Sequence, residues 1–153
     1  MITFNTEYQG SQAPQLPIQP QLIERWVQAV AAAHGRSVAD VAYLFVDDER
    51  ILAVNRQFLG HDYYTDIITF DYSEGPRIGG DLIISLDTVQ SNAQLLGQPY
   101  ERELHRVVVH GILHLCGIND KGPGEREIME AEENRALQLL DQLAATQPEA
   151  DTR

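Results

Sequence analysis

The segment 110–120, HGILHLCGIND, constrains this chain more than any other, because it places two histidines within a helical run that is otherwise almost wholly apolar. Unpaired imidazoles would be costly in such a run. His110 and His114 are four residues apart, so both rings leave the same face of a helix. Gly117 follows the run and can adopt the left-handed conformation that ends a helix. The chain can then reverse and bring Asp120 back toward the two rings.

This arrangement is typical of a metal site. Two imidazole nitrogens and one carboxylate oxygen suit zinc, and three protein ligands leave a fourth position for water. Metal-bound water ionises near neutral pH and becomes a nucleophile, so the pattern predicts hydrolysis. His110, His114 and Asp120 are therefore the predicted ligands of one Zn²⁺ ion, although another divalent ion is possible. Asn119 and Glu125 are rivals for the third position, and Asp120 could instead cap the next helix.

Apolar periodicity and turn residues predict nine elements of secondary structure. The predicted strands cover residues 2–8, 41–46, 66–72 and 81–85, and the predicted helices cover 21–34, 47–58, 87–96, 99–115 and 124–145. Residues 9–20 and 73–80 are expected to form a loop and a turn. The order favours an α+β fold in which helices pack on a sheet of about four strands. We expect a single domain over residues 1–153, with a frayed tail at 146–153.

Composition narrows the function classes. The chain has 153 residues and one cysteine, Cys116, so an internal disulfide is impossible. Neither a signal peptide nor an apolar run of the ~18 residues that a membrane span needs is visible, so we expect a cytoplasmic protein without a membrane partner. The net charge of −12 argues against tight binding of nucleic acid by charge alone. Any nucleic acid would need a local basic patch, a metal or a protein partner.

The pattern is similar to the extended zinc signature of metal-dependent peptidases, H-E-x-x-H-x-x-G-x-x-H/D, and predicts a zincin-like metal helix. Gly111 stands where those enzymes have a glutamate general base, so a peptidase or amidase would lack its base. Gly111 could leave open space beside the metal or allow close helix packing. Glu103, two turns before His110, could orient a ligand, although a solvated side chain is the simpler expectation.

Four segments together resemble the YbeY family of ribosomal RNA maturation factors, which are described as metal-dependent endoribonucleases. They are the helix with Val54, Asn55 and Phe58, the strand segments 65–70 (TDIITF) and 80–85 (GDLIIS), and the histidine block 110–117. The resemblance runs from about residue 41 to about residue 140. It implies that His110, His114 and Asp120 hold the metal, with Asp120 where the family usually has a third histidine.

A second departure from the family pattern concerns phosphate binding. Leu59 occupies the position of a family arginine, and a leucine can neither hold a phosphate nor stabilise its charge. His61, Lys121 or Arg77 could replace that arginine, although each is more simply an ordinary loop residue. His61 is therefore a candidate catalytic residue alongside the metal-bound water. Asp66 and Asp81 are expected to begin strands as turn or cap residues.

The resemblance implies metal-dependent endoribonuclease activity in ribosomal RNA maturation and ribosome assembly. The expected partners are ribosomal RNA, the small ribosomal subunit, and ribosomal proteins or an assembly GTPase that bring this acidic protein to its RNA. Two alternatives stay open from the residues alone. One is a non-enzymatic ribosome assembly factor with a structural metal, and the other is a zinc-dependent peptidase or amidase.

Overall fold

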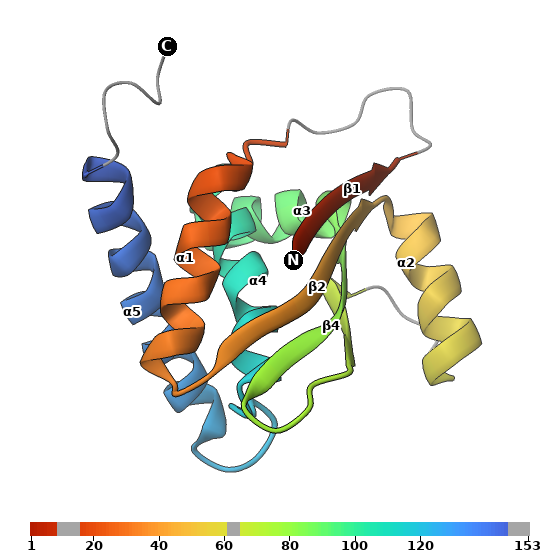
Figure 1. Cartoon of the computed structure of the whole chain (residues 1–153). Helices are drawn as coiled ribbons and strands as arrows, with labels where there is room; N and C mark the ends of the chain where they lie inside the picture. Colours follow the sequence, from red (N-terminus) through yellow and green to blue (C-terminus); the bar gives the residue numbers. More distant parts are fainter. Residues whose placement is uncertain (9–15, 61–64, 147–153) are drawn as a thin grey trace.

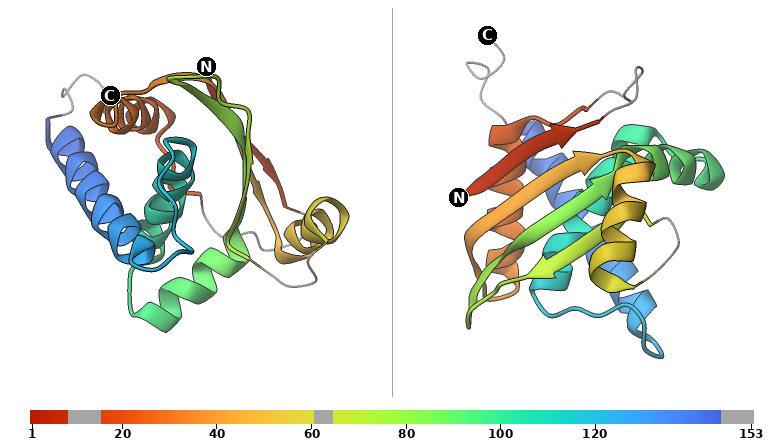
Figure 2. Two further views of the ribbon diagram at one scale, coloured as in Figure 1. Left: turned by 90° about the horizontal axis from the view of Figure 1, so that it is seen from below. Right: turned by 90° about the vertical axis from the view of Figure 1, so that its right-hand side faces the viewer.

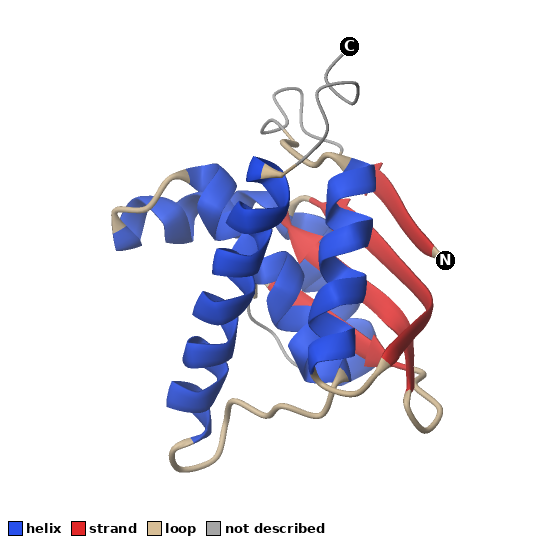
Figure 3. Ribbon diagram, turned by 60° about the vertical axis from the view of Figure 1, so that its left-hand side comes forward, coloured by secondary structure: helices blue, strands red, loops and turns tan. Residues whose placement is uncertain are grey.

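The fold is built on one four-stranded mixed sheet. The computed structural model describes residues 1–8, 16–60 and 65–146. The sheet has the strand order β1-β2-β4-β3, and the strands are β1 (Ile2–Glu7), β2 (Ser37–Val46), β3 (Ile67–Asp71) and β4 (Arg77–Ser85). β1, β2 and β4 are parallel, and β3 is antiparallel to β4. Figure 3 shows β1, which carries the N label, at one outer edge of the sheet.

Helices cover both faces of the sheet unequally. They are α1 (Pro20–Ala33), α2 (Asp48–Val54), α3 (Leu86–Leu96), α4 (Tyr100–Leu115) and α5 (Glu125–Ala145), and a π-helical turn at Asn55–Leu59 extends α2. Figures 1 and 2 show α1, α3, α4 and α5 on one face of the sheet and α2 alone on the other. The α4 side holds the large apolar core, and α2 covers a smaller cluster of Val46, Ile51, Val54 and Ile68.

Local chemistry explains where several helices begin. Pro20 is the first residue of α1, a position where proline loses no helical hydrogen bond. Asp47 caps α2 by accepting a hydrogen bond from the Arg50 N–H at 2.9 Å. Ser85 caps α3 through the Thr88 N–H. These caps place helix starts at the carboxyl ends of β2 and β4. The strands and helices follow one another in the predicted order.

Two strands, β2 and β4, begin four residues earlier than predicted, because their first residues pair with each other in the sheet. β4 begins at Arg77, so Gly79 and Gly80 are strand residues, and β2 begins at Ser37 opposite Arg77. A Cβ on Gly80 would lie 2.3 Å from the Phe70 carbonyl oxygen. Glycine therefore marks a close approach of two backbones here. Asp81 lies within β4 with its side chain exposed, so its predicted role at a strand start is wrong.

The predicted helix 47–58 is correct in position but differs at its end. Its last turn is π-helical, which rotates the side chains that follow away from the face that Ile51 and Val54 bury. Ile51, Val54 and Asn55 are buried, whereas Phe58 is 60% exposed and makes an edge contact with Phe70. Phe58 thus lies outside the buried face of this helix. Asn55 brings a buried amide to this end of the sheet.

The α+β fold with a four-stranded sheet and packed helices is confirmed. Trp26 on α1 donates a hydrogen bond from its indole N–H to the Ala136 carbonyl of α5 at 2.7 Å, which joins the outer helices. Within the described residues, no helix is long and apolar enough to cross a membrane. The loop predicted at 9–20 and the tail predicted at 146–153 lie largely outside the described residues.

Candidate metal centre

Three side chains from the histidine segment converge at the end of α4. One potential ligand atom from each of His110, His114 and Asp120 lies within 4.8 Å of the others. Nε2 of His110 is 3.3 Å from Oδ2 of Asp120, and the two imidazole rings have centroids 5.5 Å apart. All three residues are partly buried. The structure thus brings together the three residues that the sequence singled out.

The turn after α4 positions His114. Gly117 has φ +94°, which favours glycine, and it ends the helix. The Gly117 N–H donates to the His114 carbonyl, and the Ile118 N–H donates to the Leu113 carbonyl, both at 3.0 Å. This pair of bonds defines a Schellman motif. The Ile118 carbonyl then accepts a hydrogen bond from Nδ1 of His114 at 3.0 Å. Since a carbonyl can only accept, Nδ1 carries the proton and Nε2 keeps its lone pair.

His110 is oriented by a carboxylate of α5. Its Nδ1 lies 2.7 Å from Oε2 of Glu133, so Nδ1 donates and Nε2 is directed toward Asp120. Burial by itself lowers the pKa of His110. The hydrogen bond to Glu133 and the negative charges of Glu133, Asp120 and Asp66 outweigh burial, and the pKa of His110 is raised overall. The carboxylates around His110 therefore create a negative electrostatic potential, which favours a positive charge at this site.

One carboxylate oxygen of Asp120 indicates whether a cation fits between the three side chains. Its Oδ1 atom is buried and has no hydrogen-bond partner among the described residues. A buried carboxylate oxygen without a partner is costly unless a cation or water satisfies it. Two Nε2 lone pairs and this oxygen therefore form a donor set that fits a divalent ion. Of the rivals, Glu125 instead accepts a hydrogen bond from the Gly122 N–H at 2.6 Å, and Asn119 lines the adjoining cavity.

Packing decides between the two alternatives for Gly111 and overturns the expectation for Glu103. Gly111 does not leave open space, because a Cβ there would lie 3.0 Å from methyl groups of Ile67 and Leu82. It allows close packing of α4 on the sheet. Glu103 is not solvated, since it is only 5% exposed. Burial raises the pKa of the Glu103 carboxyl, against the charge of Arg106, which lowers it.

Two cavities meet at the candidate metal centre, and Asp66, His110 and Asp120 line both. The cavity on the β3 side has a volume of about 450 Å³. Its other lining residues are Asn55, Leu59, Thr65, Ile67, Ile68, Thr69, Asp71, His114, Asn119 and Lys121. The cavity on the α5 side has a volume of about 480 Å³, and its lining includes Glu103, Arg106, Arg126 and Glu133. A substrate could therefore reach the centre from either side.

The cavity on the β3 side includes Lys121, one of the residues that could replace the family arginine. Leu59 lines it and is 44% exposed, and Lys121 lines it as well. Lys121 is the one lysine in the chain. Arg77 begins β4 and is not among the lining residues. His61, the candidate catalytic residue, lies outside the described residues.

Sequence reasoning missed two acidic residues at the centre. Asp66 precedes β3 beside His110, and burial raises the pKa of its carboxyl, although the charge of His110 lowers it. Glu133 reaches the site from α5. The sequence does hold a signal for Glu133, because its spacing from Met129, Ala136 and Leu137 places a charged residue on the buried stripe of α5. No comparable local signal places Asp66.

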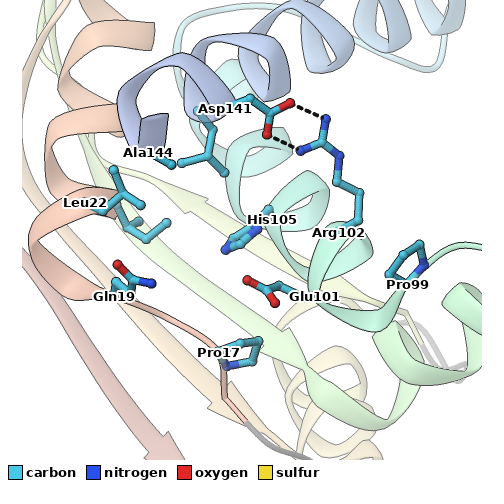
Figure 4. Close-up of a pocket in the computed structure, with 11 residues that line it drawn as sticks. Pro17, Gln19, Leu22, Pro99, Glu101, Arg102, His105, Asp141 and Ala144 are labelled. Carbon is cyan, nitrogen blue, oxygen red and sulfur yellow. Dashed lines mark hydrogen bonds and ion pairs between the residues drawn. The ribbon is translucent and has the colours of Figure 1, made fainter. Parts of the chain in front are cut away.

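A further cavity lies near the other end of α4, between α1 and α5 (Figure 4). Its volume is about 290 Å³. Arg102 lines it and forms a two-pronged ion pair with Asp141, with N–O distances of 2.9 and 3.1 Å. Both terminal nitrogens of the Arg102 guanidinium already bind the Asp141 carboxylate. A phosphate would have to compete with this carboxylate, so the cavity is poorly suited to binding one. The histidine centre is therefore the stronger candidate site.

Comparisons with known proteins agree with this geometry. Residues 6–141 match the family model described as Endoribonuclease YbeY. A protein named Endoribonuclease YbeY from Phocaeicola vulgatus is 63% identical over 92% of this chain and 99% of its own length. Another protein of that name, from Porphyromonas gingivalis, is 49% identical over 92% of this chain and 91% of its own length.

A solved structure agrees with the fold. The solution structure of TM1509 from Thermotoga maritima has a TM-score of 0.62 and 27% identity, covering 97% of this chain and 94% of that protein. The family match runs from the end of β1 into α5 and includes the glycine-bearing strand, the histidine helix and its turn. The resemblance predicted from four segments is confirmed, and the chain belongs to the YbeY family.

Proposed function

We propose that this protein is a metal-dependent endoribonuclease that acts in ribosomal RNA maturation and ribosome assembly. One observation carries the proposal: Asp120 and two histidines converge, with a buried Asp120 oxygen that lacks a partner among the described residues. Family membership supplies the reaction class, because the matched relatives are named endoribonucleases. RNA is accordingly the proposed substrate.

His110, His114 and Asp120 are the residues that would hold the ion, through two Nε2 atoms and a carboxylate oxygen. We assign zinc, because imidazole and carboxylate ligands in a set of three suit it. When bound, a divalent ion polarises the phosphodiester and lowers the pKa of water, which permits hydrolysis near neutral pH. The chain itself keeps both rings in the correct tautomer through Glu133 and the Ile118 carbonyl.

Lys121 is the proposed phosphate contact in the cavity on the β3 side. It lines that cavity directly after Asp120, whereas Leu59 at the family arginine position cannot attract an anion. An ammonium near the scissile phosphate would offset the negative charges of Asp66 and Asp71, which line the same cavity. His61 remains a further candidate for this role.

The acidic character of the protein shapes the proposal for its partners. With a net charge of −12, the chain would be repelled by free RNA at long range. We infer that ribosomal proteins of the small subunit, or an assembly GTPase, bring it to its RNA. The cytoplasm, where ribosomes assemble, is its proposed location.

The test combines metal analysis with RNA cleavage. Purified protein would be reconstituted with zinc, analysed for bound metal, and incubated with precursor ribosomal RNA, free and within small-subunit particles. We expect about one ion per chain and cleavage that chelation stops. Asp120→Ala and His114→Ala should lose both metal and cleavage, whereas Asp71→Ala, a lining residue outside the cluster, should keep the metal.

Two results would contradict the proposal. Zinc bound with full occupancy but no cleavage of free or particle-bound RNA would favour a structural metal in an assembly factor. Cleavage that persists unchanged in Asp120→Ala and His114→Ala would place the chemistry elsewhere.

A further inference from the structure

Glu133 is not one of the three clustered residues of the candidate metal centre, yet its environment is unusual. It lies on α5 and is 9% exposed, on a stripe with Met129 and Ala136. Nearby glutamates on the same helix, such as Glu127 and Glu130, are exposed. A carboxylate is rarely buried unless it is paired. The position of Glu133 therefore requires specific partners.

Both oxygens of Glu133 are used, and by different partners on α4. Oε2 accepts the hydrogen bond from Nδ1 of His110 at 2.7 Å, and Oε1 accepts one from Arg106 at 3.0 Å. The second guanidinium nitrogen of Arg106 donates to the side-chain oxygen of Asn134 at 2.9 Å. The Glu133 carboxylate thus lies between the Arg106 guanidinium, which Asn134 also binds, and the His110 imidazole. Its orientation is fixed from two sides.

From this geometry we propose that Glu133, anchored by Arg106, is a positioning residue that sets the tautomer and aim of His110 as a metal ligand. The inference rests on the proposed metal site. Because a carboxylate oxygen accepts from Nδ1, the lone pair of His110 stays on Nε2, which is 3.3 Å from Asp120. A carboxylate partner also makes an imidazole a stronger donor to a metal.

The two histidines are therefore held differently. His114 is oriented by a backbone carbonyl within its own helix turn, at Ile118, and depends only on local structure. His110 depends on α5, a separate helix that begins after the ligand loop. Correct packing of α5 on α4 is thus a condition for the site to form. A glutamate that only joined two helices would not affect the orientation of His110, whereas Glu133 accepts a hydrogen bond from the His110 ring itself.

The test measures zinc affinity and the His110 tautomer in the same variants. Glu133→Gln keeps the shape but offers one acceptor oxygen to two donors, so either His110 or Arg106 loses its acceptor. Glu127→Gln removes the same charge from the exposed face of α5 and is the matched control. Zinc affinity would be measured by competition with a chromophoric chelator. We expect Glu133→Gln to bind zinc about 10- to 100-fold more weakly than wild type, and Glu127→Gln to match wild type.

The tautomer is read without any metal. Long-range ¹H–¹⁵N spectra of the metal-free protein at a pH of about 9, where a free imidazole is neutral, report which ring nitrogen carries the proton. In wild type we expect the proton of His110 on Nδ1, and in Glu133→Gln a shift toward Nε2. His114, held by Ile118, should not change. If Glu133→Gln folds poorly, the wild-type spectrum alone still tests the inference, because a His110 proton on Nε2 would overturn it.

The outcomes separate this inference from the proposed function. Folded Glu133→Gln with wild-type zinc affinity and an unchanged His110 tautomer would overturn the inference and leave only a bond between helices. If wild type binds no zinc, the proposed metal site fails. Even then, a shift of the His110 tautomer in Glu133→Gln would support the role of Glu133 in setting that tautomer. An unchanged tautomer would refute this role.

Discussion

Replacing Gly80 by alanine tests a close approach of two backbones in the sheet. A Cβ at this position would lie 2.3 Å from the Phe70 carbonyl oxygen, whereas an unstrained carbon–oxygen contact is about 3.3 Å. The strands β3 and β4 would have to separate by about 1 Å. The neighbouring hydrogen bond from the Tyr72 N–H to the Gly79 carbonyl, now 2.9 Å, would lengthen to roughly 3.9 Å.

The cost follows from these two effects. Overpacking against a rigid neighbour typically costs about 1–3 kcal/mol, and each lost hydrogen bond about 1 kcal/mol. We expect Gly80→Ala to lower the free energy of unfolding by about 3 kcal/mol. With a urea m-value of about 2 kcal/mol/M, the midpoint would fall by about 1.5 M. The fluorescence of Trp26, the one tryptophan and fully buried, reports the transition.

The matched control is Asp81→Ala, the next residue of β4, whose side chain is exposed. It should change stability by no more than about 0.5 kcal/mol. A Gly80→Ala midpoint within about 0.3 M of wild type would show that β3 and β4 do not approach as closely as described, given the m-value used above. It would also remove the physical reason for the glycine in this strand.

Three further predictions test the core, pH dependence and metal binding. Tyr43→Phe removes the buried hydrogen bond from the hydroxyl to the Val108 carbonyl (2.9 Å) and should cost about 1 kcal/mol; an unchanged urea midpoint would contradict this. Burial raises the pKa of Glu103, so its contribution to stability is present below pH 4.5 and is lost as the pH rises. The melting temperature of Glu103→Gln, relative to that of wild type, should therefore rise between pH 4 and pH 7. A difference in melting temperature that does not vary with pH would contradict the raised pKa of Glu103. Zinc at about 100 times its dissociation constant should stabilise wild type by about 2.7 kcal/mol but not Asp120→Ala, and equal shifts in both would argue against the site.

The sequence alone determined the features that depend on neighbours along the chain. The spacing of His110 and His114 is a property of one helix turn, and Gly117 ends that helix through its own backbone freedom. Periodicity likewise predicted the strands and α-helices of the described residues in the correct order, but not the π-helical turn after α2. The resemblance to the YbeY family was also visible in the sequence, because each of the four segments that carry it is a continuous stretch of the chain.

Tertiary structure decided the features that depend on packing between elements. Gly111 contacts the sheet, Gly80 lies against β3, and Glu133 crosses from α5 to His110. None of these contacts can be read from local periodicity, because each joins residues whose distance depends on how helices and strands pack. Glu103 shows the same limit, since its burial follows from where α4 lies in the fold. Local sequence thus predicts the two histidines and the turn whose Ile118 carbonyl orients His114, whereas Glu133, which orients His110, is placed by the packing of α5 on α4.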